Sequence, residues 1–496
     1  MTKTQWGAAL LAATAMTTMS ATAVRAQATA AETVTDASPE EAAAQLEFLK
    51  AQVDALQAQL DSVKKAAGIT TPAWKGAPEF ASGSSGYKFK LSGELQFDSG
   101  YVSNPNDKIN TPNLGFNSRS RRLLIGATGT LPGDFSYTFQ FNLAEGVVDY
   151  EDMIIEFAPH KTPLTFTVGY FYPFSSMENM MSNRFTSFME RAQLNDATGN
   201  GRRLGVAATY VDKAGDFRIQ AGAFNEGING NPSPGNAATP ANQNLFDRNG
   251  YQFSARTVYS PIVEGTQVHL GASFQYRRFR TTAEGLQYRA RPFVQTTDQR
   301  LVGTGNIAAK GDEIFGVEAM AIHGPLHVAG EAQYVKVDGL RPGTVAPNTG
   351  TTILGTLYPQ NPHFITGYGE VGYWLTGETR GYKNGKVDRT KILHPVSEGG
   401  AGGFQLVGRV DYIDLTDQVG STVPNSFGLV NGGKQVGYQG ALNYWPIDYV
   451  RLTAEYVHAQ ITGGPFAAAV MNTSSSAIPN RKYGSDVVAM RAQIDF

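Results

Sequence analysis

Over most of the chain, apolar and polar residues alternate with a period of two. The last segment shows this best, because Val488, Met490, Ala492, Ile494 and Phe496 are apolar while most residues between them are polar. Side chains of a β-strand point alternately to its two faces, so this pattern predicts strands with one apolar face. An amphipathic last strand ending in Phe is typical of proteins that bacterial barrel-assembly machinery inserts, and a soluble sandwich would not need it.

Sixteen such segments, bounded by turn residues, follow one another to the end of the chain. They cover residues 87–102, 117–131, 134–144, 147–158, 164–171, 202–211, 215–225, 248–260, 266–279, 312–323, 325–337, 363–379, 402–416, 434–446, 449–463 and 484–496. Sixteen is an even number, as single-chain bacterial outer-membrane barrels require. The sequence therefore predicts an all-β transmembrane barrel of 16 antiparallel strands over residues 87–496.

The connections between these segments alternate in length, as the short periplasmic turns and long outer loops of such barrels do. Tight turns lie at 132–134, 212–215, 323–325 and 446–448, and long loops at 172–201, 226–247, 280–311, 338–362 and 464–483. Connection 380–401 departs from the pattern, because it is long although its place in the count makes it periplasmic. A β-solenoid would need a repeat of fixed period, which the sequence lacks.

The composition narrows the class of protein further. Charged residues make up only 17% of the chain, whereas soluble domains have about 25%. No uninterrupted apolar stretch has the ~18 residues that a helical membrane span needs. The formal net charge of −2 provides no basic field for nucleic acid. Cysteine is absent, which suits an oxidising compartment.

Residues 1–26 have the order of features of a signal peptide. Lys3 supplies positive charge, a modestly apolar stretch follows, and small residues offer cleavage after Ala26 or, in competition, after Ala23. The alternative is a short amphipathic helix. We expect export through the periplasm to the bacterial outer membrane.

Three further segments precede the predicted barrel: a disordered segment at 27–38, a coiled-coil helix at 39–67 and a Pro/Gly/Ser-rich linker at 68–86. The apolar residues of the helix repeat at spacings of three and four: Leu46, Leu49, Val53, Leu56, Leu60 and Val63. This is the seam of a coiled coil, and three heptads are too short to be stable without partner chains. The alternative is an amphipathic helix lying on the barrel mouth.

On each strand, the alternate positions that are mostly polar must face inward, because a charge at the lipid midplane costs about 2–4 kcal/mol. We call this assignment of alternate positions to the two faces the parity of the strand. A barrel of about 16 strands leaves an aqueous lumen, so a passive pore is the expected activity. By this parity the lumen carries nine basic residues: Lys88, Lys90, Arg122, Arg218, Arg256, Arg277, Arg409, Arg451 and Arg491. It also carries nine acidic residues: Glu94, Asp152, Glu156, Glu318, Glu331, Glu370, Asp411, Glu455 and Asp495. The balance predicts no charge preference by itself, so selectivity depends on where these charges lie.

Loop 172–201 is unusually apolar for a surface loop, with four Met and three Phe residues among its members. Folding back into the barrel would bury them against the wall and present Arg184 and Arg191 to the lumen. The alternative is a trimer contact or an ordinary surface loop.

An enzyme is not expected, and neither is a metal or a cofactor. The seven His residues show no metal-ligand spacing such as His-x-x-x-His, and no Ser/His/Asp set is recognisable.

An ordered set of motifs gives the chain a family resemblance. The motifs are Ser-Arg-Ser-Arg-Arg at 118–122, Ser-Asn-Arg at 182–184, Phe-Met-Glu-Arg at 188–191, Arg-Leu-Gly-Val at 203–206, Tyr-Trp-Leu-Thr-Gly-Glu-Thr-Arg-Gly-Tyr at 373–382, Gly-Gly-Phe at 402–404, and 409–415. In this order the chain resembles the phosphate-selective porin O/P family. The resemblance implies a homotrimer of 16-stranded barrels, each narrowed by its third loop, with an arginine ladder, a basic constriction and a lysine-rich periplasmic exit.

The resemblance, the parity and the loop together give the candidate site residues. The anion ladder and constriction are assigned to Arg119, Arg121, Arg122, Arg184, Arg191, Arg218, Arg256, Arg277 and Arg409. The basic exit in connection 380–401 is assigned to Lys383, Lys386, Arg389 and Lys391. Two positions depart from the family pattern: Leu124 stands where the family often has a further Arg, and Asn183 replaces the second Ser of the loop.

The expected function is therefore passive diffusion of small anions, phosphate in particular, through an outer-membrane pore embedded in lipid. Two alternatives remain open. The balanced lumen favours a weakly selective general porin, and the coiled coil would suit a barrel that tethers or adheres in the envelope.

Overall fold

The computed structural model describes residues 50, 52–53, 59, 73–74, 76–81, 86–105, 109, 114–146, 148–225, 250–279, 285–344, 353, 355–418, 429–470 and 477–496. The chain divides into two units, Met1–Thr71 and Pro72–Phe496. The four described residues of the first unit are all helical: Lys50, Gln52, Val53 and Gln59. The predicted signal peptide, the disordered segment and the rest of the coiled coil lie outside the described residues, so these assignments stay predictions.

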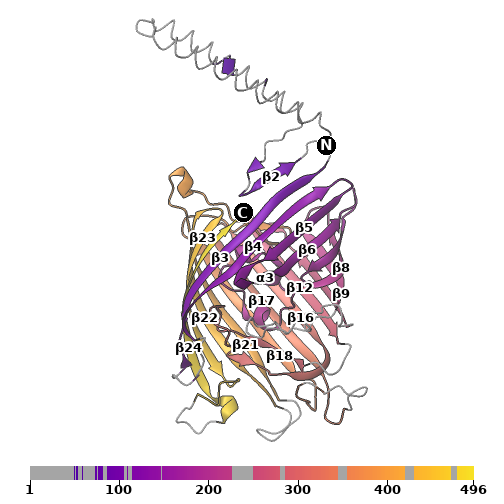
Figure 1. Ribbon diagram of the computed structural model, residues 1–496, viewed down its shortest axis with the longest axis vertical. Coiled ribbons are helices and arrows are strands. Elements are labelled where there is room, and N and C mark those ends of the chain that lie inside the picture. Colours follow the sequence, from indigo (N-terminus) through magenta and orange to yellow (C-terminus); the bar gives the residue numbers. More distant parts are fainter. Residues whose placement is uncertain are drawn as a thin grey trace. The chain divides into compact units, whose positions relative to one another are not determined.

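The second unit is a closed antiparallel barrel of 16 strands, as the alternation predicts (Figure 1). The strands are β3 (Lys88–Val102), β4 (Gly115–Leu131), β5 (Phe135–Asn142), β6 (Asp149–Phe157), β7 (Leu164–Phe171), β8 (Arg203–Val211), β9 (Phe217–Asn225), β10 (Tyr251–Tyr259), β12 (Thr266–Arg278), β16 (Ile307–His323), β17 (Leu326–Gly339), β18 (His363–Trp374), β21 (Gly403–Gln418), β22 (Leu429–Ile447), β23 (Val450–Thr462) and β24 (Lys482–Asp495). Each strand pairs with the next along the chain, and closure leaves the barrel wall without a free edge.

The barrel closes where β24 pairs with β3, from Val487 opposite Val102 to Asp495 opposite Glu94. The C-terminal Phe496 continues this pairing through two backbone hydrogen bonds to Gly93, of 3.0 and 3.1 Å. The terminal residue is thus built into the seam.

Short elements occupy the connections. The short strands are β1 (Ala73–Trp74), β2 (Pro78–Ala81), β11 (Ile262–Val263), β13 (Gly285–Leu286), β14 (Arg289–Ala290), β15 (Val302–Gly303), β19 (Tyr382–Lys383) and β20 (Lys386–Val387). The helices are α3 (Met177–Met180) and α4 (Gln193–Ala197), with 3-10 turns η2 (Ala144–Gly146), η3 (Asn183–Phe185), η5 (Val396–Glu398) and η6 (Ile478–Asn480). Part of the predicted linker is ordered, because β2 pairs with β3. Among the described residues, no helix combines the length and the apolar character needed to cross a membrane.

The two faces of the wall differ as the parity predicts. On β24 the apolar Val488 and Met490 are 56% and 63% exposed, whereas Arg491 and Gln493, at positions of the opposite face, are buried. Exposed apolar side chains recur around the barrel on β7, β8, β9, β16 and β18. An apolar outer band with polar residues inside is the arrangement that lipid requires.

The inner face is not uniform around the barrel. On β5 to β7 and parts of β8 and β9, inward residues such as Thr138, Thr167 and Gln220 are partly open to solvent. On β10, β16 to β18 and β21 to β24, nearly all inward residues are buried. We call the first region the open wall and the second the packed wall. A closed barrel thus contains a solvent-accessible side and a filled side.

Candidate functional site

A β-bulge on β4 turns two consecutive arginines toward the interior. The pairing of β3 with β4 shifts between Gln96, which lies opposite Arg122, and Phe97, which lies opposite Ser120, so Arg121 has no partner in the ladder. An extra residue in one strand re-aims its side chain and so breaks the strict alternation of faces. Alternation alone would have placed Arg121 and Arg122 on opposite faces.

All three arginines of this run have partners. Arg121 donates two hydrogen bonds to Glu190 of loop 172–201, of 2.8 and 3.0 Å. Arg122 donates to Gln96 over 2.6 Å. Arg119 forms an ion pair with Glu145 and lies 3.5 Å from Asp298. The run therefore binds parts of the protein that are far apart in sequence.

The carboxylate facing Arg121 stays ionised. Burial by itself would raise the pKa of Glu190, but the guanidinium groups of Arg121 and Arg491 outweigh burial and hold that pKa well below its usual value. Glu190 therefore neutralises one member of the predicted ladder at any ordinary pH.

Loop 172–201 is held to the packed wall by carboxylates that accept its backbone N–H groups. Glu331 accepts from Met177 over 2.6 Å and from Glu178 over 2.9 Å. Glu455 accepts from Met189 over 2.9 Å. Further bonds join Gln193 to Asp411 and Ser187 to Glu370. These bonds satisfy backbone N–H groups of the loop and buried carboxyl oxygens of the wall at the same time.

Several apolar residues of the same loop are buried. Met177, Phe188 and Met189 are each 1% exposed. Met177 packs with Met181, Met320 and other apolar residues. Burial of these side chains favours the docked position of the loop by about 1.5–3 kcal/mol each.

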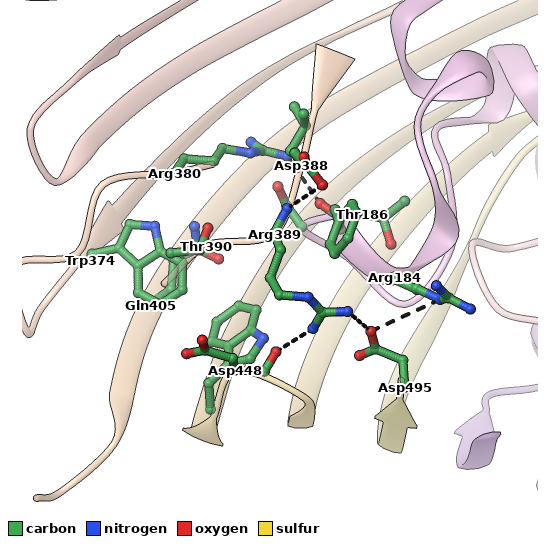
Figure 2. Close-up of a pocket in the computed structure, with 14 residues that line it drawn as sticks. Arg184, Thr186, Trp374, Arg380, Asp388, Arg389, Thr390, Gln405, Asp448 and Asp495 are labelled. Carbon is green, nitrogen blue, oxygen red and sulfur yellow. Dashed lines mark hydrogen bonds and ion pairs between the residues drawn. The ribbon is translucent and has the colours of Figure 1, made fainter. Parts of the chain in front are cut away.

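The two arginines predicted to face the lumen from this loop are both engaged. Arg184 donates to the carbonyl of Gly93 over 3.0 Å, and its Nε lies 3.4 Å from Glu94 and 4.0 Å from Asp495. Figure 2 shows Arg184 pointing toward Asp495 beside a small cavity. Arg191 donates to the carbonyl of Met181 over 2.8 Å.

Three further ladder candidates lie in buried ion pairs. Arg256 pairs with Glu318 at 2.6 Å, Arg277 pairs with Asp312, and Arg409 pairs with Glu178 and with Glu370 at 2.6 Å. The side chains in these pairs are 2% exposed or less. Their charges are compensated within the wall and are closed to solvent.

Connection 380–401 joins β18 to β21, but part of it contacts β12 and β9, which lie several strands away around the barrel. The Tyr382 hydroxyl lies 2.6 Å from Nδ1 of His269 on β12. A Cβ atom on Gly385 would lie 3.4 Å from Nε of Arg218 on β9. The hairpin of β19 and β20 thus contacts the open wall, although the connection that contains it starts at β18 and ends at β21.

The four predicted exit residues separate into two kinds. Arg389 forms an ion pair with Asp495 and donates to the carbonyl of Asp448 over 2.5 Å (Figure 2). Lys383, Lys386 and Lys391 are exposed, and within the described residues none of them has an ion-pair partner.

A second segment, 285–306, also covers the packed wall, and the sequence pattern does not predict this. Its residues Tyr288, Val294 and Leu301 are fully buried, and they join strand residues of the packed wall in the largest apolar cluster. Phe293 meets β22, where a Cβ on Gly437 would lie 2.0 Å from its ring. The composition of this segment gives no signal of this burial, because its polar residues outnumber its apolar ones.

The site is therefore an interior lined on one side by the open wall and on the other by loop 172–201 and segment 285–306, while the hairpin of connection 380–401 reaches the open wall. No group of three or more His, Asp and Glu residues that could hold a metal occurs within the described ranges. What the arrangement offers is a polar surface and fixed charges.

Comparisons with known proteins agree with this geometry. The family model described as "Phosphate-selective porin O and P" matches residues 89–496. An uncharacterized protein of Caulobacter vibrioides is 33% identical over 434 residues, which are 87% of this chain and 78% of that protein. Porin O of Pseudomonas aeruginosa is 25% identical over 420 residues, covering 78% of this chain and 86% of Porin O.

Among solved structures, the outer-membrane channel DcaP of Acinetobacter baumannii is 10% identical and superposes with a TM-score of 0.48, covering 84% of this chain and 99% of that chain. An anion-selective porin from Comamonas acidovorans is also 10% identical, with a TM-score of 0.44 and coverage of 83% and 100%. The match of the family model over most of the chain decides the assignment. The protein belongs to the phosphate-selective porin O and P family of bacterial outer-membrane porins.

Proposed function

We propose that this porin passes small anions, phosphate among them, along a water-filled path between the open wall and loop 172–201. The observation that carries the proposal is the contrast in solvent access. Inward residues of the open wall are partly accessible, whereas those of the packed wall are covered. Among the described residues this contrast supports a path for solutes beside the open wall.

The anchoring of loop 172–201 supports its role as the constriction. The loop is fixed at many points by hydrogen bonds to buried carboxyl groups of the wall and by buried Met and Phe side chains. A segment held in this way can define a narrow passage of constant width. Arg184 and Arg191 of this loop are half-buried, so part of each residue remains accessible to solvent.

Anion transport is supported by basic residues that remain accessible. Lys383, Lys386 and Lys391 are exposed, and Arg218 is half-buried. Fixed cations along a pore favour anions, because they form charge-assisted hydrogen bonds to anion oxygens. Phosphate as the physiological solute is supported by the name of the family and by the relation to Porin O.

A weakly selective porin is the second candidate, and one observation favours it. Most arginines of the predicted ladder are paired with carboxylates, such as Arg121 with Glu190 and Arg409 with Glu370. An arginine that is paired with a carboxylate can still donate hydrogen bonds to a solute. The pair, however, has no net charge that would favour anions over cations.

Reversal potentials in planar bilayers separate these candidates. With a tenfold KCl gradient across a single reconstituted channel, the anion porin should reverse close to the chloride equilibrium potential, and added phosphate should reduce its chloride current. A potential near zero without phosphate block would favour the weakly selective porin. A potential close to that of potassium would contradict anion transport, and absence of any current would favour an envelope tether.

We also propose that the chain is exported by its signal peptide and assembles as a trimer, with helix 39–67 joining the subunits. The heptad spacing of the helix supports this assembly. The test is the mass in detergent solution of the mature protein and of a variant lacking 39–67. A monomeric mature protein would contradict the trimer, and an equally stable trimer without the helix would contradict its role.

A further inference from the structure

We propose that the hairpin of β1 and β2 is a membrane anchor, whose outer face carries Trp74 and Phe80 into the headgroup layer of the periplasmic leaflet. The partner is a phospholipid surface, at the boundary between headgroups and acyl chains. This inference uses only the place of the barrel in the outer membrane, so it is independent of which solutes the pore passes.

The hairpin extends the barrel wall at the end that carries the short turns and the C terminus, which is the periplasmic end of such barrels (Figure 1). There β24 pairs with β3 as far as Glu94, and Phe496 bonds Gly93. Beyond that point β2 pairs with the same edge of β3, with Phe80 opposite Phe89, while β4 covers the other edge. The outer face of the barrel therefore continues without a break into the hairpin.

The aromatic side chains of the hairpin share one face. Trp74 lies opposite Pro78, and Pro78 is on the same face as Phe80 because alternate residues of a strand share a face. On this face Trp74 is 74% exposed and Phe80 is 47% exposed. Glu79, at the intervening position, belongs to the opposite face. The hairpin is therefore amphipathic, and its apolar face is the uncovered one.

The depth of this face matches the interfacial layer of a membrane. Leu91 and Phe97 are exposed outward residues of β3, and Phe89 is the next position of the same alternation toward the periplasm. Residues of one face are about 7 Å apart along a strand. The headgroup layer on each side of the hydrocarbon core is about 5–8 Å thick. Phe89 and the neighbouring Phe80, whose ring centroids are 6.5 Å apart, thus lie one step beyond lipid-facing Leu91.

The hairpin is held from its other side by the barrel. A Cβ on Gly76, in the turn between β1 and β2, would come 2.5 Å from the ring of Tyr449, which lies between β22 and β23. Ala77 of the same turn is buried. The Tyr449 ring also has the guanidinium carbon of Arg389 at 4.4 Å from its centroid. These contacts fix the hairpin with its aromatic face outward.

Lipid fits this face better than a second copy of the chain does. Two aromatic side chains bury about 300–500 Å² together. A stable protein interface needs about 800 Å² from each partner. In the headgroup layer, by contrast, each aromatic side chain is stabilised singly, by the same lipid that surrounds the barrel.

Depth-dependent quenching of Trp74 fluorescence tests the anchor. The chain has four tryptophans, so Trp6→Phe, Trp374→Phe and Trp445→Phe leave Trp74 as the only one. The variant is refolded into vesicles of phosphatidylethanolamine and phosphatidylglycerol, in which part of the lipid carries bromine near the carbonyl end or near the methyl end of its acyl chains. We expect the greater loss of fluorescence with bromine near the carbonyl end, because interfacial side chains lie at that depth.

Met490→Trp, combined with Trp74→Phe in the same background, is the control for depth. Met490 is an exposed outward residue in the middle of β24, so this variant should lose more fluorescence with bromine near the methyl end. For Trp74, quenching by acrylamide in the buffer without loss from either lipid would put the hairpin in periplasmic water and overturn the anchor. Protection from acrylamide and from both lipids would indicate a second copy on this face and would overturn it equally.

A spin label provides a second test that leaves every tryptophan in place. The chain has no cysteine, so Pro78→Cys carries a single nitroxide on the face of Trp74 and Phe80. Its relaxation by oxygen dissolved in lipid, relative to relaxation by a water-soluble nickel complex, should exceed that of Lys213→Cys in the exposed turn 212–215. Equal ratios at the two positions would contradict the anchor. Heat-modifiable migration in gels confirms that each variant has folded into a barrel.

Discussion

The open wall and the packed wall are built from the same alternation of apolar and polar residues, yet their interiors differ in kind. The open wall presents mostly uncharged polar groups, such as Thr138 and Gln220, to solvent. The packed wall presents buried charges, such as Glu370 and Arg409, to the segments that cover it. The comparison teaches that inward polarity has two uses in one barrel, because some polar groups contact water and others anchor loops.

The largest expected effect comes from removing a charge on the packed wall. Arg409→Ala leaves Glu178 buried without its cation and removes one of the two arginines that pair with Glu370. Breaking a buried ion pair in this way should lower the free energy of unfolding by about 3–5 kcal/mol. Guanidinium-induced unfolding of the refolded barrel in detergent measures the loss.

The matched change on the open wall is Thr167→Ala, which removes a partly accessible hydroxyl. Its effect should stay within about 0.5 kcal/mol, as for most exposed positions. Equal losses in the two variants would contradict the distinction between the walls.

The next effect concerns the fit of segment 285–306 against β22. Gly437→Val places side-chain atoms where the Phe293 ring now lies, since even a Cβ would come 2.0 Å from that ring. Overpacking should cost about 1–3 kcal/mol and displace the segment. Thermal unfolding and single-channel conductance measure both consequences, and the conductance should rise.

Gly440→Val is the control on the same strand, because a Cβ there meets nothing within 4 Å. It should change neither the unfolding temperature nor the conductance. An unchanged conductance in Gly437→Val would show that segment 285–306 does not border the path.

A smaller effect is expected from narrowing the open wall without changing its charge. Thr167→Trp adds a bulky ring to a partly accessible inward position. The single-channel conductance should fall about twofold while the permeability ratio remains, because pore width changes and the fixed charges do not. Conductance traces in symmetric KCl provide the measurement, and an unaffected conductance would place the path elsewhere.

The smallest effect is a dependence on alkaline pH. The folded-state pKa of Lys386 lies below the ordinary lysine value of 10.5, so this lysine loses its charge earlier than others as the pH rises. The anion preference should therefore decline gradually as the pH approaches that value. On the acid side Glu190, whose pKa is held well below its usual value, stays ionised from pH 7 down to about pH 5, so no change is expected there. Reversal potentials across this range decide both points.

The sequence predicts the barrel well, because the alternation is a local property of each strand. All sixteen segments match strands of the structure, and the parity of β24 is as predicted. The apolar composition of loop 172–201 predicts that it folds into the barrel; this stays a prediction, and the buried Met177, Phe188 and Met189 side chains support it.

The candidate site is predicted less completely, because pairing joins residues that are distant in the chain. Parity places Arg409 inside, but it cannot reveal that Glu178, 231 positions away, lies against it. The bulge that turns Arg121 inward is equally invisible, since it depends on how β3 and β4 align. Sequence therefore indicates which charges are inside and leaves open which of them remain uncompensated.

Cysteine accessibility tests the central claim most directly, because the chain contains no cysteine of its own. Thr167→Cys on the open wall and Thr453→Cys on the packed wall place one thiol each at inward threonines, the second of which is only 2% exposed. A negatively charged methanethiosulfonate reagent should reduce the current through the Thr167→Cys channel and leave the Thr453→Cys channel unaffected. Block of the Thr453→Cys channel alone would contradict a path along the open wall.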